Sequence, residues 1–205
     1  SPKIHNSEFI IQNFSSRNVV LWFGGIYPWM DPGPLIEAFS RISPKFPEWK
    51  LRFLGGFHPD TGYKSLYQKV ESAAKSKISS DQLEFVPWQS EKNLNKYFND
   101  VAFAVHLAKP TPEDYYAHRV RLLTLLNAGI GVLTSGKDVI SDLAVQLGAA
   151  SKTKLDTKSV EKNLIYLMNF PEQLNKMNKL CLKLEQAFVK QEMDIKFNDS
   201  NHLTL

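Results

Sequence analysis

The amino-acid sequence predicts an α/β protein built on a doubly wound parallel sheet with helices on both faces. Two observations carry this prediction. Short apolar segments alternate with helical patterns along most of the chain, which is the order of elements that a parallel sheet requires. The segments are also apolar without interruption rather than at every second residue, as expected of strands that helices cover on both sides. Right-handed crossovers between such strands give the doubly wound arrangement.

The expected strands are short runs bounded by glycine, proline or polar residues. They lie at 18–24, 50–56, 83–87, 102–107 and 130–134. Their length and their content of valine, leucine and phenylalanine are typical of buried strands. The sequence therefore predicts five strands.

Helical patterns fill the segments between these strands and continue after the last one. In 34–42, for example, Leu35, Phe39 and Ile42 share one face, and Pro34 suits the first turn of a helix. The other expected helices lie at 63–77, 115–128, 138–147 and 157–168, with a short helix from Ser90 and a long one from Pro171. The chain is thus expected to form five strand–helix pairs followed by two closing helices.

Length and composition indicate one globular domain. We expect it at 18–194, between a leader or linker at 1–17 and a tail at 195–205. The content of 43% hydrophobic and 22% charged residues excludes a disordered or low-complexity chain. The single cysteine, Cys181, excludes an internal disulfide and a cysteine-built metal site, and we interpret it as a buried thiol. Because no apolar run approaches the roughly 18 residues of a membrane span, and no apolar signal core opens the sequence, we expect a cytoplasmic location.

Positive charge is concentrated in one segment of a chain whose formal net charge is only +4. Residues 41–80 hold eight basic and three acidic residues. Such a segment can face nucleic acid or an anionic membrane surface, although a solvated, lysine-coated face is the favoured interpretation. We expect no nucleic-acid partner, and a nucleic-acid-binding module is the weaker alternative, which salt-dependent binding to random DNA would support.

The loop after the first strand is the first candidate binding site, because ligands of doubly wound sheets bind at the carboxyl ends of the strands. Gly24 and Gly25 follow the strand directly and would let a ligand approach the backbone. The start of the next helix favours a phosphate. The segment lacks both the dinucleotide fingerprint and the P-loop pattern. The alternative interpretation is a tight turn with Trp29 packed on the surface.

The loop after the fourth strand is the second candidate. Arg119 and Arg121 lie near the start of a helix, where the helix dipole and two guanidinium groups would form a diphosphate clamp. Residues two apart point to different sides of a helix, so only one of them is expected to reach a shared ligand. The alternative is two structural arginines in ion pairs. Glu113, taken alone, is interpreted as an acid that caps the helix start.

Two further features complete the candidate site. Trp88 and Gln89 follow the third strand, where an aromatic ring and an amide would contact a nucleobase; a tryptophan that caps the core is the alternative. The five histidines have no metal-ligand spacing, so no metal site is expected. His106 ends an apolar strand and is interpreted as a core histidine, and no Ser-His-Asp arrangement is evident.

Five ordered segments resemble a known family. They read VVLWFGGIYPWMDPGPLIEAF, WKLRFLGG, LEFVPWQSEKNLNKYFNDVAFAVHL, RVRLLTLLNAGIGVLTSG and YLMNFPEQLNKMNKL. Over residues 18–190 the chain resembles the C-terminal, donor-binding domain of GT-B glycosyltransferases, in the retaining family called glycosyl transferases group 1, or family 4. The resemblance implies a Rossmann-like domain that binds a nucleoside-diphosphate sugar as donor substrate, without a separate cofactor.

The resemblance also implies what the whole enzyme does. It would transfer a hexose to a glycan or lipid-linked acceptor, most often in bacterial surface polysaccharide synthesis at the inner face of the membrane. A GT-B enzyme needs a second, N-terminal domain that carries the acceptor site. Only one domain is present in this sequence, so the 205 residues alone are expected to be inactive.

The chain departs from the family pattern at the phosphate-binding loop. Family members commonly carry an arginine after the first loop glycine and a lysine a few residues on, and these places correspond to Gly25 and Met30. The resemblance then implies that Arg119 or Arg121 supplies the lost positive charge.

A second departure concerns the family's paired glutamates, which are eight residues apart. They fall near Tyr116 and Thr124, so a threonine would replace the carboxylate that holds the ribose hydroxyls, and Glu113 would take over a sugar or ribose contact. These changes leave an alternative open, in which the chain is a degenerate, non-catalytic GT-B-like domain that binds nucleotide, glycan or a protein partner.

Overall fold

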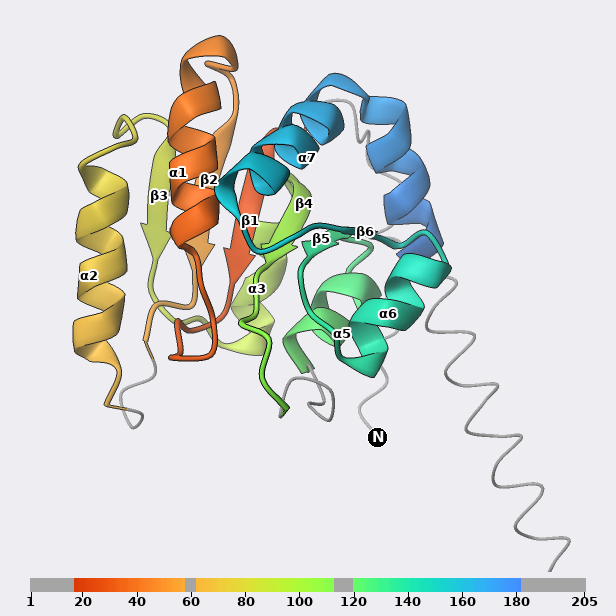
Figure 1. The fold of residues 1–205 in the computed structure, drawn as a ribbon, viewed down its shortest axis with the longest axis horizontal. Coiled ribbons are helices and arrows are strands. Elements are labelled where there is room, and N and C mark those ends of the chain that lie inside the picture. Colours follow the sequence, from red (N-terminus) through yellow and green to blue (C-terminus); the bar gives the residue numbers. More distant parts are fainter. Residues whose placement is uncertain (1–16, 58–61, 113–119, 182–205) are drawn as a thin grey trace, which may run out of the picture.

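The structure is a computed structural model, and it describes residues 17–57, 62–112 and 120–181. These residues form a six-stranded sheet in the order β3-β2-β1-β4-β5-β6, with every neighbouring pair parallel (Figure 1). The strands are β1 (Val19–Phe23), β2 (Lys50–Leu54), β3 (Leu83–Val86), β4 (Val101–His106), β5 (Val132–Thr134) and β6 (Ala150–Lys152). The predicted doubly wound parallel sheet is confirmed, and its strand order is that of the Rossmann fold.

Helices connect the strands and follow the last one. They are α1 (Gly33–Ile42), α2 (Lys64–Lys75), α3 (Glu91–Phe98), α5 (Val120–Asn127), α6 (Val139–Gln146) and α7 (Thr157–Asn169), with a short 3-10 turn at Ser43–Lys45 and further helix at 171–181. The expected leader apart from its last residue, the tail at 195–205 and the first part of the helix expected at 115–128 lie outside the described residues.

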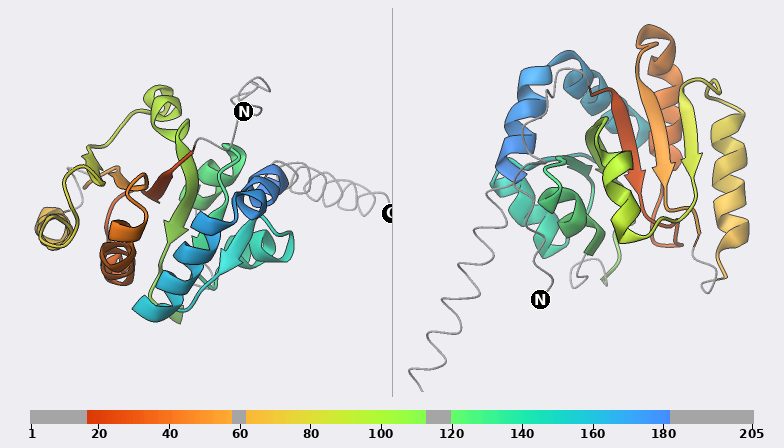
Figure 2. Two further views of the ribbon diagram at one scale, coloured as in Figure 1. Left: turned by 90° about the horizontal axis from the view of Figure 1, so that it is seen from above. Right: turned by 180° about the vertical axis from the view of Figure 1, so that it is seen from behind.

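Alternating residues of the central strand explain why helices cover both faces of the sheet (Figure 2). In β1, Val20 and Trp22 belong to a core shared with α1, α2 and α7. Val19 and Leu21 belong to a second core, shared with α3, α5 and α6. Because both faces are buried, the strand carries no polar residue, which is the pattern that predicted a parallel sheet.

The sixth strand was not predicted. Only Ala150 of β6 is fully buried, and Ser151 and Lys152 are polar. The strand is three residues long and pairs with β5 alone, at the edge of the sheet. A strand this short and this polar carries no hydrophobic pattern, so only its pairing with Leu133 and its neighbours makes it a strand.

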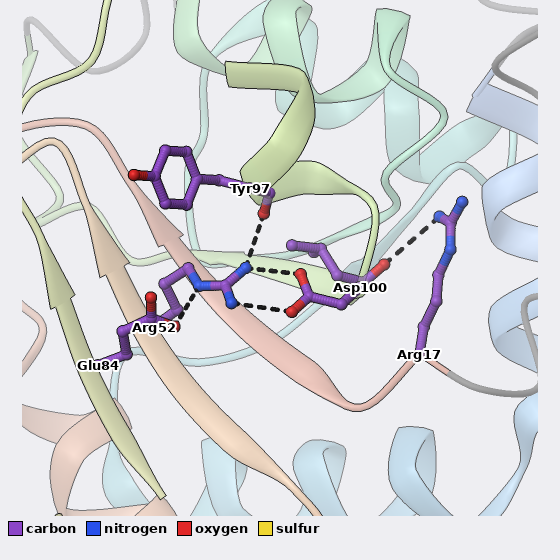
Figure 3. Close-up of polar contacts among 6 residues, drawn as sticks. Arg17, Arg52, Glu84, Tyr97 and Asp100 are labelled. Atoms are coloured by element: carbon purple, nitrogen blue, oxygen red, sulfur yellow. Dashed lines mark hydrogen bonds and ion pairs between the residues drawn. The ribbon is translucent and has the colours of Figure 1, made fainter. Parts of the chain in front are cut away.

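A buried arginine is the main exception to the apolar character of the strands. The side chain of Arg52 in β2 is almost completely buried and contacts the neighbouring strand and the turn before β4 (Figure 3). Its Nε donates a hydrogen bond to Glu84 (2.6 Å), its Nη1 and Nη2 donate to the two carboxylate oxygens of Asp100 (2.6 and 2.8 Å), and Nη1 also donates to the Tyr97 carbonyl (2.8 Å). Burial lowers the Arg52 pKa, but the hydrogen bonds and charges of Asp100 and Glu84 outweigh it, so the pKa is raised.

Several cations of the basic segment 41–80 are neutralised by partners. Those in ion pairs are Arg41 with Glu37 and Glu161, Arg52 with Glu84 and Asp100, Lys75 with Glu71, and Lys77 with Glu37. The segment therefore presents less positive charge than its composition indicates, which agrees with a solvated face. Within the described ranges, the helices are all too short or too polar to cross a membrane.

Candidate functional site

The strand order reverses between β1 and β4. The chain leaves β1 into α1 on one face of the sheet and leaves β4 toward α5 on the other, so the two loops diverge at the carboxyl ends of these strands (Figure 1). Ligands of open α/β sheets bind at this position. The candidate site is therefore built from residues 24–32, from 107–112 and from the start of α5.

Hydrogen bonds join the loops after three strands to one another. The Asp31 N–H donates to the Leu107 carbonyl (3.1 Å), which pairs the loop after β1 with the loop after β4. The Ser135 hydroxyl, in the loop after β5, accepts from the Ala108 N–H (3.0 Å) and donates to the Ala108 carbonyl (3.1 Å). Because each loop is bonded to the next, the backbone at this edge has a defined arrangement before any ligand binds.

Gly24 is required by the close approach of β1 and β2 at their carboxyl ends. Its φ is +89°, and its N–H donates to the Leu54 carbonyl (2.7 Å). A Cβ atom added to Gly55, whose φ is +123°, would lie 2.9 Å from the Gly24 Cα. A side chain is excluded at Gly55 by both the backbone conformation and the space, and is disfavoured at Gly24 by the backbone conformation.

Arg121 reaches the glycine turn from the first part of α5. Its Nη1 donates to the carbonyls of Gly25 (3.2 Å) and Phe23 (3.4 Å). A Cβ added to Gly24 would lie 3.1 Å from the Arg121 Cζ. The guanidinium therefore occupies the space beside the turn and places a positive charge at the point where the strand order reverses.

Aromatic side chains surround this arginine. The Arg121 Cζ lies 5.4 Å from the centre of the Tyr27 ring, a cation–π contact. Tyr27 in turn stacks on Trp29, with ring centres 4.9 Å apart and parallel planes, and meets the edge of Tyr63 at 5.7 Å. A Cβ added to Gly25 would lie 3.2 Å from the Tyr27 ring. The two glycines thus make room for side chains of the protein itself, and Trp29 packs on the turn as the alternative interpretation expected.

The turn also offers hydrogen-bond donors. Among the residues that the structure describes, the N–H groups of Gly25, Ile26 and Tyr27 donate to no acceptor. The N–H groups of three consecutive residues are donors suited to an anionic oxygen, and the Arg121 guanidinium bonds to a carbonyl of the same turn.

Two of the helices that start at this edge, α1 and α6, have acidic side chains at their starts. The Asp31 carboxylate accepts the Gly33 N–H (3.0 Å) at the start of α1. Asp138, which is fully buried, caps α6 by accepting the N–H (2.9 Å) and the hydroxyl (2.7 Å) of Ser141. The expectation that the first turn of α1 favours a phosphate is therefore weakened, because a carboxylate already bonds to it.

The remaining predicted site residues have separate surroundings. Trp88 is 60% exposed, which does not fit a tryptophan that caps the core. The Gln89 amide donates to the Pro87 carbonyl (3.2 Å), and the Thr124 hydroxyl donates to the Val120 carbonyl one helical turn earlier (3.0 Å).

The remaining two candidates, Glu113 and Arg119, lie outside the described residues. Of the predicted set, the structure brings Gly24, Gly25 and Arg121 into contact. In the three described stretches, His, Cys, Asp and Glu form no group that could hold a metal ion.

Tyr27 and Lys109 are parts of the site that were not predicted from the sequence. Lys109 donates its Nζ proton to the Pro28 carbonyl (2.8 Å) and so fixes the loop after β1 to the loop after β4. Tyr27 could have been suggested by its position, two residues after a glycine pair and two before Trp29, because two large rings so close in a loop are expected to pack on each other. No sequence signal pointed to Lys109.

The six-stranded parallel sheet with helices on both faces is the Rossmann-like fold of the C-terminal domains of GT-B glycosyltransferases, as the sequence resemblance predicted. Similar solved structures include the C-terminal domain of the glycosyl transferase group 1 family protein LpcC from Francisella tularensis, with a TM-score of 0.63 and 16% identity, over 83% of this chain and 85% of that one. WaaG, a glycosyltransferase involved in lipopolysaccharide biosynthesis, aligns with a TM-score of 0.67 and 14% identity, over 82% of this chain and 42% of that one.

A third similar structure carries ligands. Alr3699/HepE from Anabaena, determined in complex with UDP and glucose, aligns with a TM-score of 0.66 and 13% identity, over 90% of this chain and 49% of that one. The chain thus spans less than half of WaaG and of HepE. At such identities the likeness establishes the fold. No protein-family model and no curated protein matches the sequence.

Proposed function

We propose that the chain is the donor-binding domain of a retaining glycosyltransferase, which binds a nucleoside-diphosphate sugar and transfers its hexose to a glycan or lipid-linked acceptor. The observation that carries this proposal is the contact of Arg121 with the Gly24–Gly25 turn at the reversal of strand order. The similarity to glycosyltransferase domains, among them one determined with UDP and glucose, supports it.

The proposed chemistry follows from the donors at the turn. When the sugar leaves, negative charge develops on the diphosphate, and preorganised donors stabilise that charge. The N–H groups of Gly25, Ile26 and Tyr27 would bind phosphate oxygens. The positively charged Arg121 bonds to the Gly25 carbonyl of the same turn. Arg119 would add a second cation.

The other predicted residues would hold the rest of the donor. In this proposal Trp88 and Gln89 contact the nucleobase, and Glu113 and Thr124 contact the hydroxyls of the sugar or the ribose. Trp88 is 60% exposed, so much of its side chain is accessible to a base, which supports its part.

The setting of the enzyme is part of the same proposal. A second, N-terminal GT-B domain would supply the acceptor site, so this chain alone would bind donor without turnover. The lipopolysaccharide role of WaaG supports an enzyme of bacterial surface polysaccharide synthesis. We place it in the cytoplasm, with peripheral contact to the inner face of the membrane and no nucleic-acid partner.

Ligand-observed NMR with UDP, GDP, dTDP and ADP tests the proposal. We expect one nucleotide to bind near millimolar, which corresponds to about −4 kcal/mol. Arg121→Ala should weaken that binding about tenfold or more, because hydrogen bonds and charge worth about 1.5–3 kcal/mol are lost from the turn. Arg41→Ala, which removes an exposed arginine from the far end of α1, is the matched control and should leave the affinity unchanged. Binding that is equal in all three proteins would refute the role of Arg121.

A second function, a non-catalytic domain, is favoured by specific observations. Met30 stands where the family commonly has a lysine, and its side chain is only 4% exposed, within the core. The Asp31 carboxylate at the start of α1 opposes a phosphate there. If none of the four nucleotides binds at several millimolar, while the fold is intact by thermal melting, this second function replaces the first.

A further inference from the structure

We propose that Tyr27 is a positioning residue of the glycine turn, and that its ring fixes Arg121 so that the amides of the turn face a diphosphate. Tyr27 belongs to no sequence pattern that assigns it a role in the site. The inference rests on the proposed function for the identity of the ligand, whereas the contact of Tyr27 with Arg121 is tested independently.

Two other aromatic rings hold the ring of Tyr27 in place. Trp29 stacks on its ring with parallel planes at 4.9 Å, and Tyr63, the residue before α2, packs its edge against both rings at an interplanar angle of 85°. The three side chains come from the loop after β1 and from the start of α2. The position of the Tyr27 ring is therefore set by two elements rather than by its own rotamer.

The ring restricts where Arg121 can go. The guanidinium lies 5.4 Å from the ring centre, and the same group fills the space beside Gly24. A partly exposed arginine has many rotamers of similar energy, and fixing it costs conformational entropy. Because the Tyr27 ring and the Gly24 backbone lie against the guanidinium, the arginine is already ordered before a ligand arrives.

Arg121 in turn sets the direction of the peptide groups. The carbonyl oxygens of Phe23 and Gly25 both accept from its Nη1 (3.4 and 3.2 Å). In a trans peptide the carbonyl and the following N–H point in opposite directions. The N–H of Ile26 is therefore directed away from Arg121, as is that of Gly24, which donates to the Leu54 carbonyl (2.7 Å).

The sequence pattern predicted that the arginines bind the diphosphate directly. In this geometry Arg121 orients the turn, and the N–H groups of the turn would bind the diphosphate. The Nη1 protons of Arg121 bond to backbone carbonyls, and the phosphate oxygens would bond to the amides on the other side of the turn. Arg121 then contributes its charge and the orientation of the turn, while Tyr27 contributes the orientation of Arg121. Losing the ring should weaken anion binding without removing any group that touches the anion.

The experiment compares Tyr27→Ala, Tyr27→Phe and a control. Tyr67→Ala is the matched control, because Tyr67 is also half-buried and packs on other rings, those of Phe57 and Phe85, and not on Arg121. Two quantities are measured by NMR on isotope-labelled protein: the chemical shifts of the Arg121 δ-CH₂ and Nε–H groups, which the ring current of Tyr27 moves, and the dissociation constants of UDP and inorganic pyrophosphate. Thermal melting checks that each variant folds.

We expect Tyr27→Ala to remove the ring-current shift of Arg121 and to weaken binding of both probes about fivefold, the size of one cation–π contact. Tyr27→Phe, which restores the ring, should restore both quantities, and Tyr67→Ala should leave both at the wild-type values. A merely structural role would lower the melting temperature of both alanine variants without a selective change in affinity.

The outcomes separate this inference from the proposed function. If the wild type binds UDP and Tyr27→Ala binds it equally well, the inference is wrong and the proposed function stands. If pyrophosphate binding depends on the ring but no nucleotide binds, the inference stands and the proposed function is wrong. If the Arg121 shifts do not respond to Tyr27→Ala, or the wild type binds neither probe, the inference is overturned.

Discussion

Substituting Asp100 by asparagine tests whether the ion pairs of Arg52 stabilise the sheet. The substitution keeps the shape of the side chain and removes the negative charge that faces the guanidinium of Arg52, a residue that is only 7% exposed. Asp100 accepts two hydrogen bonds from the guanidinium, at 2.6 and 2.8 Å, whereas asparagine has one acceptor oxygen. Each hydrogen bond to a charged group is worth about 1.5–3 kcal/mol.

The expected loss is smaller than for a fully buried pair. Removing one partner of a buried ion pair costs about 3–5 kcal/mol, but the side chain of Asp100 is 46% exposed, so water screens part of the interaction. Glu84 also remains to balance the arginine. We therefore expect Asp100→Asn to lower the free energy of unfolding by about 2 kcal/mol.

Urea unfolding measures this change as a shift of the midpoint at constant slope. Glu37→Gln is the control, because Glu37 is an exposed carboxylate that also pairs with two cations, and its variant should unfold almost like the wild type. The double variant Arg52→Met with Asp100→Asn should recover part of the loss, since the buried charge leaves with its partner. If Asp100→Asn shifts the midpoint no more than Glu37→Gln, the network has no stabilising role.

Three further predictions concern the backbone, a thiol and a helix cap. Gly55→Ala should destabilise the fold by about 3 kcal/mol, since the new Cβ would meet backbone at 2.9 Å. Gly56→Ala, whose φ of +57° also disfavours a side chain but whose nearest neighbour is at 3.7 Å, should cost only about 1 kcal/mol in the same urea assay. Burial raises the pKa of the Cys181 thiol to about 12, so iodoacetamide at pH 8 should label it only after unfolding, and rapid labelling of the native protein would contradict this. The Ser159 N–H and hydroxyl lower the pKa of Asp156 at the start of α7. Its stabilising effect is therefore present above the ordinary carboxyl pKa and lost as the pH falls below it, so the melting temperatures of wild type and Asp156→Asn should converge in acid and differ at neutral pH.

The core strands were predictable because burial on both faces requires a continuous run of apolar residues, which is visible in the local sequence. β1 and β4 are apolar at almost every residue, and each lies within one residue of its predicted range. β6 has no such apolar run, because only Ala150 is buried and the strand is defined by its pairing with β5. Strand pairing is a long-range property, and a three-residue edge strand shows little of it in sequence.

The buried charge in β2 also could not be predicted from the local sequence. Arg52 occupies a strand that was predicted to be apolar on both faces. Its partners come from β3 and from the turn before β4, 32 and 48 residues away. An arginine is compatible with the interior only when such partners converge on it, and their convergence depends on the register of three elements.

The position of the glycine turn was predicted correctly. The sequence could not show whether the glycines make room for a ligand or for a side chain of the protein. A pair of glycines after the first strand indicates that something approaches the backbone closely. The steric requirement is the same for a ligand and for a side chain of the protein. Here Arg121 and Tyr27 fill the two spaces, and Arg121 lies 96 residues from the carbonyl it contacts. Only the packing of α5 against the sheet decides between the two possibilities.

Charges at the carboxyl edge give an anion a preferred location within the proposed site. Carboxylates of Asp31 and Asp138 bond to the first turns of α1 and α6, so the positive ends of these two helix dipoles are already compensated. The turn after β1 differs, because the guanidinium of Arg121 contacts it and the N–H groups of Gly25, Ile26 and Tyr27 have no acceptor among the described residues. A diphosphate at this edge would meet repulsion at both helix starts and attraction at the turn. In this protein the task that helix dipoles usually perform for phosphates would therefore fall to a short backbone segment, and the side chains that orient that segment would determine its affinity.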